Sequence, residues 1–213
     1  AERERMTKAL DGAILGSMFF EPSTRTRVSF GSAFNLLGGE VRETTGFEHS
    51  AIAKGESLYD TARVLSGYSD VIVMRHPESG SVAEFAAASR VPVINGGDGS
   101  NEHPSQALLD LYTIRKEREH QGGEVDGLRI ALVGDLKYGR TVHSLCQLLA
   151  VYSSLHIVLV SPDELRMPEF IIEYLRERGH TVIESDQLEA SIRQVDIVYS
   201  TRLQEERFAS SQE

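Results

Sequence analysis

The amino-acid sequence predicts an α/β protein with two parallel-sheet domains, the second of them incomplete. Short apolar runs bounded by turn residues alternate with amphipathic stretches, which is typical of the strands and helices of parallel sheets. A polar, glycine-rich stretch over 120–127 divides this alternation into two halves, and we interpret it as a linker. The predicted domains are therefore 1–120 and 127–213. Because the chain stops soon after an apolar strand, we expect the second domain to lack part of its fold.

In the first half, each predicted element follows from the spacing of its apolar residues. Continuous apolar runs bounded by turn residues predict strands, and apolar residues at helical spacing predict helices. A polar, glycine-containing stretch over 44–57 is interpreted as a long surface loop, with a functional lid as the sharper alternative. The predicted strands are 12–20, 70–76 and 91–97, and the predicted helices are 26–39, 57–68, 81–89 and 104–119.

The second half repeats the same alternation after the linker. Parallel sheets place their ligands at the carboxyl ends of the strands, so the residues that follow each strand are the candidates for chemistry. The predicted strands are 128–135, 155–161, 180–185 and 195–201, and the predicted helices are 140–152, 168–179 and 187–194.

Composition narrows the class of protein and its partners. The 213 residues carry a net charge of −10, which argues against a nucleic-acid partner and requires any anionic ligand to be held by a local cluster of cations. The single cysteine, Cys146, excludes an internal disulfide and favours a cytoplasmic location. No apolar run approaches the ~20 residues of a membrane span, and no signal-peptide pattern is seen, so no membrane association is predicted.

The turn after the first strand has the composition of an anion site. Ser23 and Thr24 stand where a helix begins, and free backbone N–H groups and the helix dipole favour an anion there. Arg25 supplies a planar guanidinium that matches phosphate oxygens, and Thr26 and Arg27 continue the turn. A capped helix with exposed arginines is the alternative, but cations at a helix N-terminus are unfavourable unless an anion is bound. The sequence therefore predicts a phosphate site here.

Further polar residues follow the other predicted strands, although each is a weak signal alone. Nicotinamide cofactors are not expected, because Gly134 is followed by a sequence without the G-x-G-x-x-G pattern. No cofactor and no metal are predicted, since no His, Cys and Asp residues have metal-ligand spacing, and Cys146 lies in an apolar helical stretch that suits packing. The polar residues that follow the other predicted strands are Arg75, His103, Gln106, Arg140, Arg202 and Gln204.

Taken together, these motifs closely resemble those of the aspartate/ornithine carbamoyltransferase family. The pair "STRTR" and "HPSQ" marks the wider family, whereas "SAIAKGES" and "GDLKYGRTVHSL" point to its aspartate-specific members. Relative to the family pattern, most of a first helix and the last part of the second domain are missing. The motifs that carry the resemblance are "FFEPSTRTRVSF", "SAIAKGES", "MRHP", "HPSQALLDLYT", "GDLKYGRTVHSL" and "STRLQEERF".

The resemblance implies a substrate, a site and an assembly. It implies carbamoyl transfer from carbamoyl phosphate to L-aspartate in pyrimidine biosynthesis, within a cytoplasmic homotrimer whose active sites are shared between subunits. The implied phosphate and carbamoyl ligands are Ser23, Thr24, Arg25, Thr26, Arg75, His103 and Gln106, with Ser50 and Lys54 donated by a neighbouring subunit. The implied aspartate ligands are Arg140, Arg202 and Gln204. The implied catalytic residues are Arg25, Thr26, Arg75, His103 and Lys54.

Electrostatics gives this assignment a physical reason. The two reactants together carry about four negative charges, which repel one another strongly in a partly dry site unless clustered cations oppose them. Two alternatives stay open: an ornithine-type carbamoyltransferase, and a catalytically silent homologue that binds phosphate and trimerises. Regulatory subunits or fused pathway enzymes also stay open as partners, because no residue pattern bears on them.

Overall fold

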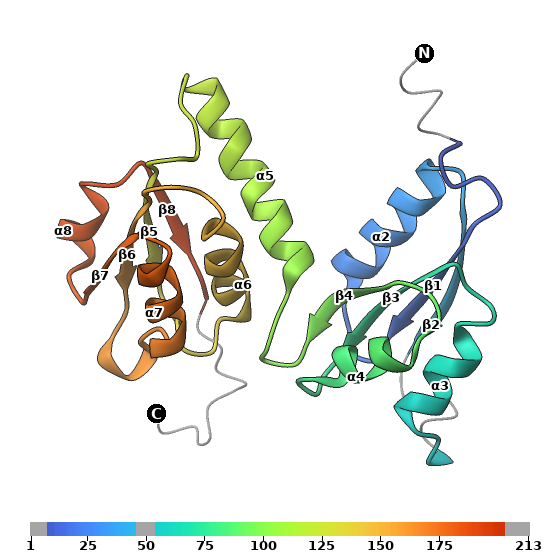
Figure 1. The fold of residues 1–213 in the computed structure, drawn as a ribbon. Coiled ribbons are helices and arrows are strands. Elements are labelled where there is room, and N and C mark those ends of the chain that lie inside the picture. The colour runs from blue at the N-terminus through green and yellow to red at the C-terminus, as the bar shows by residue number, and fades with distance from the viewer. Residues whose placement is uncertain (1–7, 46–53, 203–213) are drawn as a thin grey trace. The chain divides into compact units, whose positions relative to one another are not determined.

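The computed structural model describes residues 8–45 and 54–202 of the chain. By contacts within the chain it divides into two compact units, Ala1–Glu102 and His103–Glu213. Each unit is built on a four-stranded parallel sheet (Figure 1). The prediction of two parallel-sheet α/β domains is therefore confirmed.

The first unit has two central strands and two edge strands. The strand order is β2-β1-β3-β4, and every neighbouring pair is parallel. The strands are β1 (Ile14–Phe19), β2 (Glu40–Thr45), β3 (Val71–His76) and β4 (Val93–Asp98). The helices are α2 (Thr24–Leu36), α3 (Leu58–Leu65) and α4 (Ser81–Ala88).

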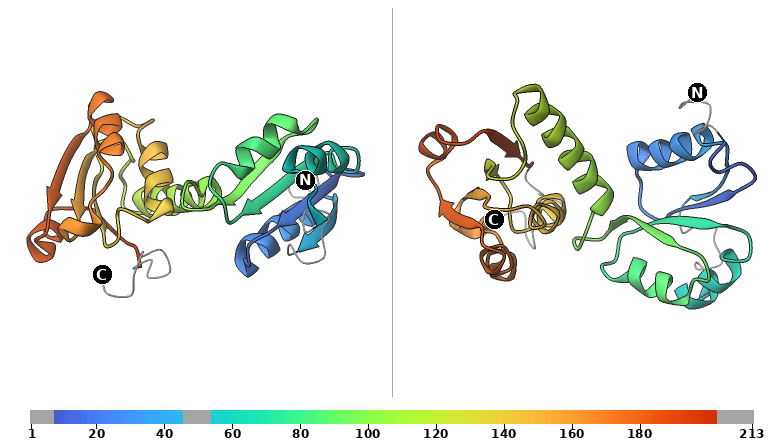
Figure 2. Two further views of the ribbon diagram at one scale, coloured as in Figure 1. Left: turned by 90° about the horizontal axis from the view of Figure 1, so that it is seen from below. Right: turned by 45° about the horizontal axis from the view of Figure 1, so that its top comes forward.

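Helices cover both faces of this first sheet, as Figures 1 and 2 show. Alternate residues of β1 point to opposite faces of the sheet. Leu15 and Phe19 pack with Phe34 of α2 on one face, and Met18 packs with buried residues of α3 and α4 on the other. The unit consequently has two separate hydrophobic clusters, one on each face. Burial on both faces explains why β1 and β3 read as continuous apolar runs in the sequence.

The edge strand β2 was not predicted, and its composition explains the omission. Its sequence is EVRETT, in which only one residue is apolar. An edge strand pairs on one side alone, and Glu40 and Arg42 lie in solvent, where they form an ion pair at 2.6 Å. Pairing along β1 supplies the order that the apolar pattern does not indicate.

The second unit repeats the architecture with different proportions. The strand order is β7-β6-β5-β8, again all parallel. The strands are β5 (Arg129–Val133), β6 (His156–Val160), β7 (Thr181–Ser185) and β8 (Ile197–Ser200). The helices are α5 (Pro104–His120), α6 (Arg140–Leu149), α7 (Glu169–Glu177) and α8 (Leu188–Ile192), with a 3-10 turn η2 (Asp163–Leu165).

A single large hydrophobic cluster holds the second unit together. It joins α5, α6 and α7 to β5 and β6, and side chains such as Ile130, Leu145 and Ile157 are fully buried in it. Part of the sheet lies outside this cluster, and Ile183 of β7 and Val198 of β8 remain half exposed. By its contacts α5 belongs to this unit, and the predicted boundary after residue 120 stays a prediction. Every helix in the described part is too short or too polar to cross a bilayer.

Candidate active site

The predicted phosphate turn lies where β1 ends and α2 begins. Ser23 is the N-cap of α2 with an extended backbone (φ −158°, ψ 96°), yet its side chain makes no capping hydrogen bond. The first turn holds no acidic residue, and Thr24 and Arg25 are exposed while Ser23 and Thr26 are half-buried. Hydroxyl groups, an exposed guanidinium and the first N–H groups of a 13-residue helix therefore share one turn, which is the composition of a phosphate site.

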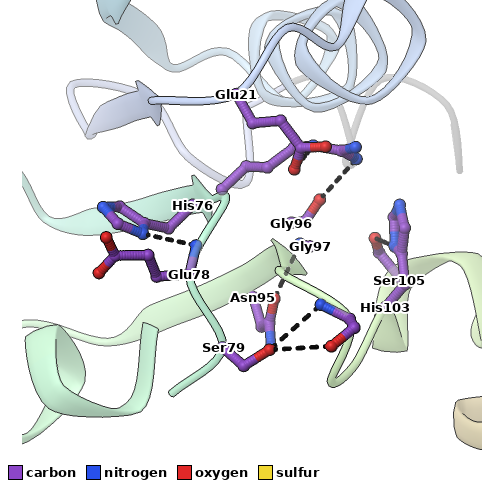
Figure 3. A network of polar contacts seen from close by, with 11 residues as sticks. Glu21, His76, Glu78, Ser79, Asn95, Gly96, Gly97, His103 and Ser105 are labelled. Carbon is purple, nitrogen blue, oxygen red and sulfur yellow. Dashed lines mark hydrogen bonds and ion pairs between the residues drawn. The ribbon is translucent and has the colours of Figure 1, made fainter. Parts of the chain in front are cut away.

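Arg75 lies beside this turn, near the carboxyl end of β3. Its backbone pairs with Phe19 of β1, and its carbonyl accepts a hydrogen bond from Phe20 N at 2.9 Å. Its buried guanidinium donates from Nε to Glu21 Oε2 at 3.2 Å and from Nη1 to Gly96 O at 3.4 Å. Figure 3 shows Glu21 and Gly96 in this network. The side chain is thus fixed between the strand ends of β1 and β4.

A local irregularity in β4 makes room for the arginine. Met74 pairs with Asn95 but His76 pairs with Asp98, so β4 carries one residue more than β3 over this interval. Gly97 has φ +129°, and a Cβ there would lie 3.1 Å from Arg75 Nη1. Its amide donates to Asn95 Oδ1 at 2.8 Å (Figure 3). Only glycine fits a backbone that is both in this conformation and this close to a guanidinium.

His76, the last residue of β3, is a structural side chain of the same sheet edge. It is 3% exposed, packs edge-on against Phe20, and its Nδ1 accepts a hydrogen bond from Glu78 N at 3.1 Å (Figure 3). Burial lowers the pKa of His76 below 6.5, against the opposing effect of nearby carboxylates. The imidazole is therefore held in its neutral form, in which Nδ1 can accept.

In the second unit, His103 is fixed by a serine that sequence reasoning missed. His103 is the buried N-cap of α5, and its backbone N donates to Ser144 Oγ of α6 at 2.9 Å. Its Nδ1 lies 3.3 Å from Ser105 Oγ (Figure 3). Both ends of the residue are thus tied within the unit, which limits the directions in which its Nε2 can point.

Gln106 belongs to a second group of contacts that the sequence did not indicate. Its Nε2 donates to Asp110 Oδ1 at 2.9 Å, and the Tyr199 hydroxyl donates to Asp110 Oδ2 at 2.9 Å. Burial raises the pKa of Tyr199 to about 12; a hydrogen bond with Thr141 opposes this shift, and the charge of Asp110 adds to it. The available signals were the i, i+4 spacing of Gln106 and Asp110 on a helix and a tyrosine ending an apolar strand.

The turn from β5 to α6 places Arg140 as the first residue of that helix, with 8% of its surface exposed. The turn is tightly packed: Asp135 is fully buried and its Oδ1 accepts from Tyr138 N at 2.8 Å. His143 Nε2 contacts Leu136 O at 2.7 Å. This contact joins the first turns of α6 to the preceding loop, so the imidazole of His143 supports the turn.

Arg202 follows β8, the strand next to β5 in the same sheet, and is exposed. Thr201 N donates to Val133 O at 2.8 Å, and a Cβ at Gly134 would lie 2.5 Å from Thr201 O. The ends of β5 and β8 are therefore in direct contact. The predicted aspartate ligands Arg140 and Arg202 thus follow neighbouring strand ends of one sheet.

Three further residues of the predicted site are Ser50, Lys54 and Gln204. Ser50 and Gln204 lie outside the described residues, and Lys54 is described and exposed.

Cys146 is fully buried in the core of the second unit, and burial raises the pKa of its thiol to about 12. The predicted packing role of Cys146 is confirmed, because a buried protonated thiol is a poor nucleophile. Within the described residues, no cluster of His, Cys, Asp or Glu is suited to hold a metal ion.

Comparison with known proteins gives a match for each half of the chain. Residues 1–116 match the family model described as the aspartate/ornithine carbamoyltransferase carbamoyl-P binding domain. Residues 126–213 match the model described as the Asp/Orn binding domain of the same family. The aspartate carbamoyltransferase catalytic subunit of Saccharophagus degradans is 73% identical over the whole chain, and that of Cellvibrio japonicus is 70% identical. The chain spans 63% of the length of each of these two relatives.

Solved structures give the same result. The catalytic subunit of Methanocaldococcus jannaschii aspartate transcarbamoylase is 51% identical with a TM-score of 0.85, over 97% of this chain and 66% of that one. The Trypanosoma cruzi enzyme in complex with carbamoyl phosphate and aspartate is 45% identical with a TM-score of 0.87, over 96% of this chain and 64% of that one. The chain therefore belongs to the aspartate/ornithine carbamoyltransferase family.

Proposed function

We propose that the protein containing this chain transfers the carbamoyl group of carbamoyl phosphate to the amine of L-aspartate, which gives N-carbamoyl-L-aspartate and phosphate for pyrimidine biosynthesis. The observation that carries the proposal is the Ser23–Arg25 turn beside the fixed guanidinium of Arg75, at adjacent strand ends of one sheet. The relatives named above support the substrates, since the Trypanosoma cruzi enzyme has been solved with both of them.

In this proposal the first unit binds the phosphate group. Ser23, Thr24 and Thr26 supply hydroxyls and backbone N–H groups, and Arg25 supplies a guanidinium in solvent reach. Arg75 contacts both the phosphate and the carbamoyl oxygen. Because its guanidinium is already held by Glu21 and Gly96, little side-chain entropy is lost when the ligand binds.

The second unit supplies the ligands of the carbamoyl group and of aspartate. His103 and Gln106 bind the carbamoyl end, and Arg140, Arg202 and Gln204 bind the two carboxylates of aspartate. An acceptor with a cationic side chain, such as ornithine, would place its charge near Arg140 and Arg202, which is unfavourable in a partly buried site. This electrostatic argument favours aspartate over ornithine.

The reaction needs no covalent intermediate with the protein. The lone pair of the neutral amine forms a C–N bond at the carbamoyl carbon, and the bond from that carbon to the bridging phosphate oxygen breaks with its electron pair. Thr26, Arg75 and His103 donate hydrogen bonds to the carbonyl oxygen as it gains negative charge. The departing phosphate accepts the amine proton, while Arg25 and Lys54 balance its charge.

The assembly we propose is a cytoplasmic homotrimer in which Ser50 and Lys54 reach the site of a neighbouring subunit. Lys54 is exposed, which this role requires. Mixed trimers of Lys54→Ala and His103→Ala subunits test the arrangement, because one site in such a trimer can contain both native residues. Recovered activity supports shared sites, and inactive mixed trimers would argue for sites within single subunits.

An activity screen and a binding measurement test the proposed function in the full-length protein. We expect turnover of carbamoyl phosphate with L-aspartate and none with L-ornithine. Calorimetric titration with a bisubstrate analogue that joins a phosphonate to aspartate should show tighter binding than either substrate alone. A protein that binds phosphate but not the analogue, and turns over neither amino acid, would instead be a silent phosphate-binding homologue.

A further inference from the structure

We propose that Asp110 and Tyr199 are positioning residues that fix the amide of Gln106 with its carbonyl oxygen toward the carbamoyl nitrogen. The inference rests on the proposed function, because it concerns the carbamoyl group that Gln106 is assigned to bind. All the contacts that carry it lie within the second unit, on α5, α6 and β8.

The hydrogen bonds determine which end of the Gln106 amide faces the protein. A carboxylate can only accept, so the Gln106 atom 2.9 Å from Asp110 Oδ1 is the amide nitrogen. The opposite end of the amide is then the oxygen, which is an acceptor. The spacing of four residues along α5 places the two side chains on one helix face and makes this contact local.

Tyr199 gives Asp110 a second point of attachment. Its hydroxyl donates to Asp110 Oδ2 at 2.9 Å, so each carboxylate oxygen holds a different donor. With both oxygens bound, rotation of the carboxylate would break both contacts, and the orientation of Gln106 is fixed from a neighbouring element. Tyr199 is held in turn by its strand β8, which pairs with the central strand β5, and by a hydrogen bond with the hydroxyl of Thr141 on α6.

The carbamoyl group needs the acceptor that this arrangement provides. Its oxygen requires donors, and its NH₂ group requires an acceptor. Among the side chains assigned to the carbamoyl end, Arg75 can only donate and His103 is assigned to donate to the oxygen. The acceptor role therefore falls to Gln106, and an amide free to rotate would present its own NH₂ group to the carbamoyl NH₂ in part of its population.

Binding measurements on the full-length protein test the proposal, with carbamoyl phosphate and inorganic phosphate as separate ligands in calorimetric titrations. Asp110→Ala removes both attachments and should weaken carbamoyl phosphate about tenfold, the effect of one hydrogen bond in a ligand site. Phosphate affinity should stay within about twofold, because phosphate does not contact Gln106. Tyr199→Phe should weaken carbamoyl phosphate about threefold. Asp110→Asn, which keeps one acceptor for Gln106, should recover part of the loss.

Two comparisons separate positioning from a merely structural role. In a Gln106→Ala background, Asp110→Ala should have no further effect on carbamoyl phosphate affinity, because Asp110 acts through Gln106. Tyr112→Phe, at an exposed tyrosine of the same helix, should leave both affinities unchanged.

Three outcomes would overturn the inference. The first is an equal loss of both affinities in Asp110→Ala, and the second is an Asp110→Ala effect that persists without Gln106; each would show that the contacts only stabilise the fold. The third applies if Asp110→Ala does not fold: a Tyr199→Phe protein that binds carbamoyl phosphate with wild-type affinity would then be sufficient to reject the positioning role. A native protein that binds no carbamoyl phosphate would remove the proposed function as well, whereas native binding with unchanged variants rejects the positioning role alone.

Discussion

The two strand-to-helix turns that carry the candidate anion ligands are built in opposite ways. The turn from β1 to α2 leaves Thr24 and Arg25 exposed, and Ser23 makes no capping hydrogen bond with its side chain. The turn from β5 to α6 buries Asp135 and Arg140 and has a neighbouring strand end against it. Both helices lack an acidic residue in the first turn, so each presents an uncompensated helix N-terminus.

Two similar strand-to-helix turns can therefore contribute differently to ligand binding and to folding stability. In the first turn, Thr24 and Arg25 are exposed and the Ser23 side chain makes no capping hydrogen bond, so substitution of these residues should change ligand affinity with little effect on stability. Side chains of the second turn are enclosed by protein, so their substitution should change both. Substitutions in the two turns and pH changes near each sheet should separate these contributions.

The backbone of the second turn should be the most sensitive position. Gly134 has φ +117°, and a Cβ there would meet Thr201 O at 2.5 Å, so Gly134→Ala should lower the free energy of unfolding by about 3 kcal/mol. At the first turn, Ser23→Ala should change it by less than about 0.5 kcal/mol, although N-cap serines usually contribute more. Urea denaturation of both variants checks this pair, and equal losses would contradict the comparison.

The two arginines should separate binding from stability. Arg25→Ala should leave the free energy of unfolding within about 0.5 kcal/mol of the native value, because the side chain is exposed. The same substitution should lower the affinity for inorganic phosphate about tenfold. Arg140→Ala should lower the free energy of unfolding by about 2 kcal/mol, because the arginine is buried, and should leave phosphate affinity unchanged. Denaturation and phosphate titration on the same samples measure both quantities. A stable Arg140→Ala protein would be evidence against an enclosed turn.

At alkaline pH the second unit should lose stability through Tyr199. Its pKa is raised from 10.0 to about 12 in the folded state, so the native state keeps a proton that the unfolded chain has released. The free energy of unfolding should therefore fall as the pH rises from about 10 to about 12. In Tyr199→Phe this decline should be shallower, as denaturation at a series of alkaline pH values would show. Parallel curves for the two proteins would contradict the expectation.

At acidic pH the first unit should respond, more weakly, through His76. Burial lowers the pKa of His76 below 6.5, while Glu78, Asp98 and Glu84 oppose the shift. The unfolded chain then binds a proton before the native state does, so the free energy of unfolding falls as the pH drops below 6.5. His76→Asn keeps an acceptor near the Nδ1 position without titrating. The stability difference between the two proteins should shrink below pH 6.5, and a constant difference would count against the assignment.

Most of the fold was predictable because buried strands leave a plain signal in the sequence. The runs that became β1, β3, β5 and β6 are apolar and bounded by turn residues, and the structure confirms each as a strand. The edge strand β2 escaped prediction because its order comes from pairing with β1 and its own residues are mostly polar.

Candidate site residues could be proposed from the sequence where they lie at the end of a buried strand or in the turn and helix start that follow it, as Arg75, Arg25 and Arg140 do. Its supporting contacts were not, because they join residues far apart in the chain. Asp110 and Tyr199 are 89 positions apart, and Ser144 lies 41 positions from His103. A serine in a helix or a tyrosine in a strand has no pattern that names its distant partner, and only the folded backbone brings such pairs together.

The bond from the His103 amide to Ser144 has a use in hydrogen-exchange experiments. Because that amide is buried and its acceptor lies on α6, its exchange with solvent deuterium should follow local opening of the second unit. The matched family model, however, extends the first domain to residue 116. The exchange rate of this one amide hydrogen therefore shows whether His103 opens together with the second unit, to which its contacts assign it, or with the first domain, to which the family model assigns it.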